Sequence, residues 1–85
     1  MNNYERKFKR KDLARRVKEL LIERGINQSD LSRLSSLGTD HVSHIVRNGQ
    51  RLTLESLNEL CLALNTTPNY LMYGMDADYV PNYII

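Results

Sequence analysis

Apolar residues recur along the chain with the spacing of amphipathic helices. The first such stripe is formed by Leu13, Val17, Leu20 and Leu21. These positions lie three or four residues apart, which places them on one helical face. Gly25 ends this helix because glycine adopts left-handed backbone easily. Tyr4 and Phe8 extend the stripe toward the N-terminus, so Asp12 is one candidate start and an earlier start stays open.

Two short helices follow, separated by a brief interruption. Asn27 is a good N-cap for a helix over Gln28–Ser35. The segment 36–38 then breaks the pattern, and either Gly38 or Thr39 caps a third helix that runs to about Arg47. Two short helices joined by a tight turn that contains glycine form a helix-turn-helix.

Two more helices complete an all-α chain. Thr53 caps the fourth helix, and Thr67 with Pro68 at the first helical position opens a brief fifth helix that ends near Gly74. The apolar face of the fourth helix is predicted to be Leu54, Leu57, Leu60, Cys61 and Leu64. The residues after Gly74 are apolar enough to pack on the domain or to pair with a second copy, although a floppy end also stays open.

The third helix divides into an inner and an outer face. A small core between the second and third helices is predicted from Leu31, Leu37, Val42 and Ile45. The outward row consists of Thr39, Asp40, Ser43, His44 and Arg47. These side chains are polar and have no obvious duty inside the molecule. A helix of this kind fits the major groove of DNA, which is about 12 Å wide.

Charge is distributed unevenly along the 85 residues. The net charge is only +2, yet five of the six residues in 6–11 are basic. Such a block suits a polyanion such as DNA or an anionic membrane surface, and a solvated tail is the plain alternative.

Several functional classes are not expected. The chain offers no nucleophile with a plausible base and no phosphate-cradling glycine loop, so we expect no enzyme, no cofactor and no small-molecule ligand. His41 and His44 lack further ligands for a metal site. Cys61 is the only cysteine, so it cannot form an internal disulfide, and we interpret it as a core residue. Neither a membrane segment nor a signal peptide is expected, so we expect a cytoplasmic protein.

The region Leu13–Leu71 resembles the Cro/CI-type helix-turn-helix family of phage repressors and bacterial regulators. The resemblance rests on the segments 24–31, 42–45, 54–57 and 63–64. The loop 47–53 also resembles the equivalent loop of controller proteins from restriction–modification systems. This resemblance implies a compact five-helix, lambda-repressor-like domain that binds double-stranded DNA.

The resemblance also implies a role for individual residues. It places Thr39, Asp40, Ser43 and His44 at base edges. It places Asn27, Gln28, Arg47, Asn48 and Arg51 at the DNA backbone. Lambda repressor, a member of the family, wraps DNA with a basic arm, which implies a similar use for Lys9, Arg10 and Lys11.

Two residues depart from the family pattern. Position 36 is serine where glycine is usual, so the turn must form without a residue that adopts left-handed backbone freely. Asp40 repels phosphates, although it suits the positive end of a helix dipole and can accept a hydrogen bond from cytosine.

We therefore divide the chain into an arm or helix extension (1–11), a helix-turn-helix domain (12–74) and a tail (75–85). Because one short helix reads few base pairs, we expect a homodimer on a palindromic operator, with the fifth helix and the tail as candidate dimer surface. The alternative function is an antitoxin-type or other protein-interaction module on the same fold.

Overall fold

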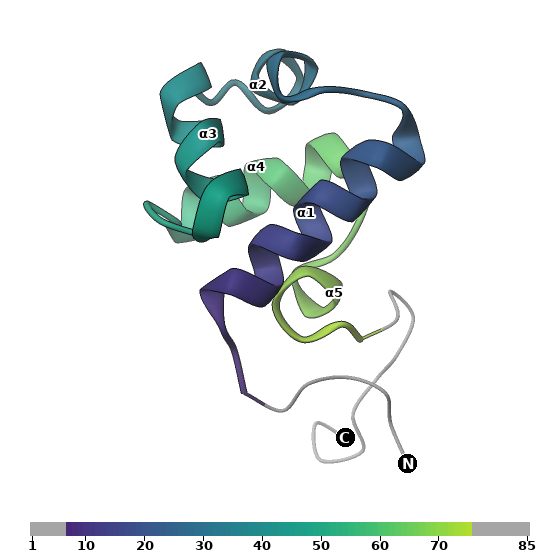
Figure 1. Ribbon diagram of the computed structural model, residues 1–85, viewed down its shortest axis with the longest axis vertical. Helices are drawn as coiled ribbons and strands as arrows, with labels where there is room; N and C mark the ends of the chain where they lie inside the picture. The colour runs from purple at the N-terminus through teal and green to yellow at the C-terminus, as the bar shows by residue number, and fades with distance from the viewer. Residues whose placement is uncertain (1–6, 76–85) are drawn as a thin grey trace.

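The computed structural model describes residues 7–75, which form five helices and no strand (Figure 1). The helices are α1 (Arg10–Arg24), α2 (Gln28–Ser35), α3 (Thr39–Asn48), α4 (Leu54–Leu64) and α5 (Pro68–Tyr73). α1 crosses the middle of the molecule with α4 behind it. α2 and α3 lie on one side of α1, and α5 lies on the other side. The predicted all-α fold is confirmed.

One apolar core joins these helices. Its fully buried members are Leu13, Val17, Leu31, Val42, Ile45, Leu60, Leu64 and Leu71. Leu20 and Leu21 are also buried, so the core contains the whole predicted stripe of α1 together with Leu31, Val42 and Ile45 of the predicted core between α2 and α3. Leu37 is half-buried and packs against this core from the turn between α2 and α3. Since each buried leucine or valine contributes about 1.5–3 kcal/mol, this shared core fixes α2 and α3 as one unit.

Side-chain caps set most helix starts as the sequence predicts. The side chains of Asn27, Thr53 and Thr67 each accept a hydrogen bond from a backbone N–H in the first turn of the following helix. The N-cap of α3 is Gly38, one of the two candidates, and it makes no side-chain bond. For α1 the N-cap is Lys9, so the helix begins before Asp12, inside the segment assigned to the arm.

Two apolar residues behave differently from the expected stripes. Leu54 is 84% exposed, so its assignment to the buried face of α4 was wrong. It occupies the first helical position and lies off the line of Leu57, Leu60 and Leu64, so its side chain points away from the buried face. Phe8 lies outside α1 but packs against the core, so the apolar stripe continues past the helix. Tyr4 lies outside the described residues.

Three serines build the turn between α2 and α3. The Ser32 hydroxyl donates to the carbonyl oxygen of Leu37. The Leu37 N–H donates to Ser35 Oγ over 3.3 Å, and that hydroxyl donates to the carbonyl oxygen of Ser32. Ser36 itself adopts left-handed backbone with φ 62°. The turn therefore keeps the left-handed residue typical of a helix end although a serine occupies the position.

The core also contains Cys61 and Met75. Cys61 is buried, as predicted, and burial raises the pKa of its thiol to about 11. Met75, the first residue of the predicted tail, is 8% exposed, so it belongs to the packed domain. The rest of the tail (76–85) lies outside the described residues.

The left-handed serine generates a stability prediction. Ser36→Gly removes the steric cost of left-handed backbone and should raise the free energy of unfolding by about 0.5–1 kcal/mol. The matched control is Ser43→Gly in the interior of α3, which should lower it by about 0.5 kcal/mol. Urea unfolding measures both changes. A destabilising Ser36→Gly would show that the serine side chain, and not its backbone, is needed in the turn.

Candidate nucleic-acid interface

The predicted base-contacting residues lie together on the outer side of α3. The inner side of the helix is closed by Val42, Ile45 and Val46, which are at most 3% exposed. Thr39 and Asp40 are exposed at its first turn, and Ser43 and His44 are half-exposed one turn later. Because opposite helix faces are 180° apart, burial of the inner face points this row away from the protein.

His44 presents only part of its ring to the outside. Its Nδ1 is buried and has no hydrogen-bond partner among residues 7–75. The same is true of Oδ1 of Asn48, one turn further along α3. His44 is therefore left with Nε2 as the ring nitrogen that can meet an external group. Asn48, which was expected to contact the DNA backbone, has only its amide nitrogen left for that role.

The expected backbone-contacting residues occupy the two ends of this face. Gln28 is exposed at the first position of α2, and Arg47 and Arg51 are exposed at the end of α3 and in the following loop. None of these three side chains makes a hydrogen bond or ion pair within the described part of the chain. A hollow of about 370 Å³ lies beside Gln28, and the exposed cation Lys18 of α1 lines it.

Asn27 and Asp30 use their side chains inside the protein. Asn27 Oδ1 accepts from the Asp30 N–H over 2.8 Å, and Asp30 Oδ2 accepts from the Asn27 N–H over 3.0 Å. Asp30 also pairs with Arg33. The Arg33 side chain and the Asn27 N–H lower the pKa of the Asp30 carboxyl below its usual value. This reciprocal cap fixes the N-terminus of α2, and with it the exposed Gln28.

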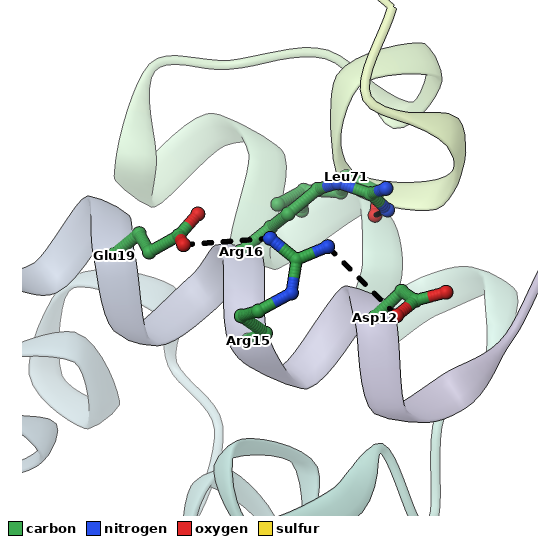
Figure 2. Close-up of polar contacts among 5 residues, drawn as sticks. All are labelled: Asp12, Arg15, Arg16, Glu19 and Leu71. Atoms are coloured by element: carbon green, nitrogen blue, oxygen red, sulfur yellow. Dashed lines mark hydrogen bonds and ion pairs between the residues drawn. The ribbon is translucent and has the colours of Figure 1, made fainter. Parts of the chain in front are cut away.

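Several arginines of the basic N-terminal region are used for folding. Arg16 is 4% exposed and donates to the carbonyl oxygen of Leu71 over 3.0 Å, which ties α1 to α5 (Figure 2). Arg24 donates to the carbonyl oxygen of Leu64 over 2.6 Å at the end of α4. Arg15 pairs with Asp12 and Glu19 along α1 (Figure 2). The positive charge of this region is therefore less available to a ligand than its count indicates.

The predicted arm residues divide into two groups. Lys9 and Lys11 are exposed and make no hydrogen bond or ion pair with residues 7–75. Arg10 is also on the surface, but its guanidinium donates to the carbonyl oxygen of Gly49 over 3.1 Å. The start of α1 therefore lies against the loop after α3. Arg6 lies outside the described residues.

Besides the bond of Arg10 to Gly49, a contact of His41 at this face is absent from the sequence-based expectations. His41 Nε2 lies 2.8 Å from the carbonyl oxygen of Arg51. This contact is not predictable from the sequence, because no local pattern links a histidine to a carbonyl group ten positions away. Within residues 7–75, no three His, Cys, Asp or Glu side chains gather into a metal-binding group, and no helix could span a membrane.

A known family of domains matches most of this chain. Residues 16–73 match the model of the Cro/C1-type HTH DNA-binding domain. No curated protein matches the chain at a significant level.

Solved structures of restriction-modification controller proteins are also similar to this chain. The restriction-modification controller protein C.AhdI from Aeromonas hydrophila is 27% identical, with a TM-score of 0.69, over 74% of this chain and 96% of that one. The wild-type controller C.Esp1396I is 27% identical, with a TM-score of 0.65, over 73% and 80%. C.Esp1396I bound to a 19-base-pair DNA duplex is 27% identical, with a TM-score of 0.65, over 73% and 83%.

The cap of α2 generates a pH prediction. Because the pKa of Asp30 is lowered in the folded state, its charged form stabilises the fold above its unfolded pKa of about 4. That contribution is lost as the pH falls through the folded pKa. Asp30→Asn should therefore have a lower free energy of unfolding than the parent at pH 7. The difference between the two free energies should become smaller between pH 5 and pH 3. Urea unfolding of both proteins across this pH range checks the prediction. A difference in free energy of unfolding that does not change with pH would contradict it.

Proposed function

Because the chain belongs to the family of Cro/C1-type HTH DNA-binding domains, we propose that it is a transcriptional regulator that binds a palindromic operator as a homodimer. The observation that carries the proposal is the outer face of α3. Its polar side chains lie on the side of the helix opposite the apolar inner face, which is buried in the core. In this role the protein acts as a repressor in the cytoplasm, without catalysis or a cofactor. The similarity to restriction-modification controllers supports a regulator of this small size.

We assign two kinds of contact to this face. Thr39, Asp40, Ser43 and His44 meet base edges in the major groove. His44 Nε2 and the two hydroxyls can each donate or accept a hydrogen bond, so the row can distinguish base pairs by their pattern of donors and acceptors. The Asp40 carboxylate only accepts, and we assign it to a cytosine amino group or to the helix dipole.

Backbone contacts surround this row. Gln28 with Asn27 lies at the start of α2, and Arg47, Asn48 and Arg51 lie at the other end of α3. Lys9, Arg10 and Lys11 extend the positive surface beside the loop at Gly49. Contacts with phosphates carry no sequence information, so they supply affinity and register while the α3 row supplies specificity.

The base-reading assignment predicts a loss of preference without a loss of fold. Alanine at Thr39, Ser43 and His44 together should abolish discrimination between the operator and random DNA, because each good base contact is worth about 1–3 kcal/mol. The operator is first obtained by selection from a random DNA pool. The matched control, Lys11→Ala, should weaken binding to all sequences alike and reduce the salt slope by about one. An unchanged preference in the triple variant would overturn the assignment.

The homodimer has its own test. One recognition helix reads too few base pairs for useful specificity, so two copies should occupy half-sites about 10–10.5 base pairs apart. α5 and the tail are the proposed contact between copies. Sedimentation in the ultracentrifuge at micromolar concentration, with and without the selected DNA, should detect a dimer. A monomer under both conditions would contradict the proposed homodimer and favour the protein-interaction alternative.

A further inference from the structure

The loop between α3 and α4 has an unusual backbone. Gly49 and Arg51 both adopt left-handed conformations, with φ of 76° and 62°. Glycine does so easily, but arginine has a Cβ that is crowded in this region. A non-glycine residue keeps such a conformation only when its surroundings hold it, and such residues gather at functional sites. The loop therefore needs a source of restraint.

Two side chains from different helices provide this restraint. Arg10 of α1 donates through a guanidinium N–H to the carbonyl oxygen of Gly49 over 3.1 Å. His41 of α3 lies 2.8 Å from the carbonyl oxygen of Arg51 through Nε2. A carbonyl oxygen only accepts, so His41 must carry its proton on Nε2 to make this bond. The loop is thus bonded to α1 on one side and to α3 on the other.

Close packing strengthens the contact with α1. Gly49 is buried, and a Cβ at this position would lie 2.5 Å from the carbonyl oxygen of Arg10. No side chain fits there, so the loop backbone rests directly on the start of α1. The position of the loop is therefore set relative to both the recognition helix and the Lys9–Lys11 segment.

The restrained loop carries an exposed cation. The Arg51 side chain is exposed and makes no hydrogen bond or ion pair within residues 7–75. Its own carbonyl group is the one that His41 holds, so His41 fixes the backbone from which this guanidinium projects. His41 lies on the first turns of α3, the helix that we assign to the major groove. The bond therefore ties the direction of Arg51 to the helix that reads the bases.

We propose that His41 and Arg10 are positioning residues that hold the loop 49–51 so that Arg51 reaches a DNA phosphate beside the recognition helix. This inference rests on the proposed function and deepens it, since it names the residues that set one of the backbone contacts. His41 acts through the loop, and Arg10 acts through the loop in addition to its own positive charge, so both govern affinity for every sequence and leave the base preference unchanged.

A double-mutant cycle tests the inference in the full chain. His41→Ala and Arg51→Ala should each lower affinity for the selected duplex by roughly five- to tenfold near 0.1 M salt, and each should reduce the salt slope by about one. The double variant should bind no more weakly than Arg51→Ala alone, because His41 acts through Arg51. His41→Gln should restore most of the affinity, since its amide can donate to the same carbonyl oxygen.

A pair of variants with equal charge loss gives the control. Arg10→Met and Lys11→Met both remove one positive charge, but only Arg10→Met removes the bond to Gly49. Arg10→Met should therefore couple to Arg51→Ala, and Lys11→Met should be additive with it. This pair also decides the matter if His41→Ala fails to fold, which thermal unfolding monitored by circular dichroism would reveal.

Other outcomes separate the inference from the function that it builds on. Additive effects of His41→Ala and Arg51→Ala, or of Arg10→Met and Arg51→Ala, would overturn the positioning role while DNA binding stands. A change of preferred sequence in His41→Ala would overturn it as well, because His41 would then read a base. A parent protein without salt-dependent binding to duplex DNA would instead refute the proposed function itself.

Discussion

Burial of the inner face of α3 is the interaction on which the rest of the structure depends. Val42, Ile45 and Val46 seal this ten-residue helix against the core. An isolated helix of this length is marginal in water, so α3 is helical mainly because it is packed. The same packing decides which side chains point outward. The row from Thr39 to His44 is therefore a consequence of the core as much as of its own sequence.

The use of the cations follows a similar division. Arg16 and Arg24 cap the ends of other helices through carbonyl oxygens, and Arg10 restrains the loop after α3. Lysines occupy the exposed positions at the start of α1, as at Lys9 and Lys11. Arginine suits the first role because its planar guanidinium directs several donors at fixed angles, and lysine suits a solvated point charge. Net charge alone does not separate the two uses.

Local patterns in the sequence predicted most of the fold. The starts of α2, α4 and α5 follow from Asn27, Thr53 and Thr67, because a cap involves residues only three positions apart. The start of α1 and the exposure of Leu54 did not follow, since both depend on which neighbour covers a position.

The candidate site was predictable to a similar degree. The outward row of α3 follows from helical periodicity, and its assignment to DNA follows from the family resemblance. The bonds of Arg10 to Gly49 and of His41 to Arg51 span 39 and 10 positions and leave no periodic trace. Only the folded arrangement brings these groups together. The same holds for the buried Nδ1 of His44, which depends on the packing around α3.

The most direct test of the account is amide NMR of the parent protein during titration with its selected duplex. The largest shifts should fall on Gln28, on the outward residues of α3 and on the loop 49–51, with smaller shifts at Lys9–Lys11. The amides at the end of α4, around Cys61–Leu64, should stay nearly unchanged. Shifts concentrated on α4, with α3 unaffected, would contradict the assignment of α3 as the helix that meets DNA.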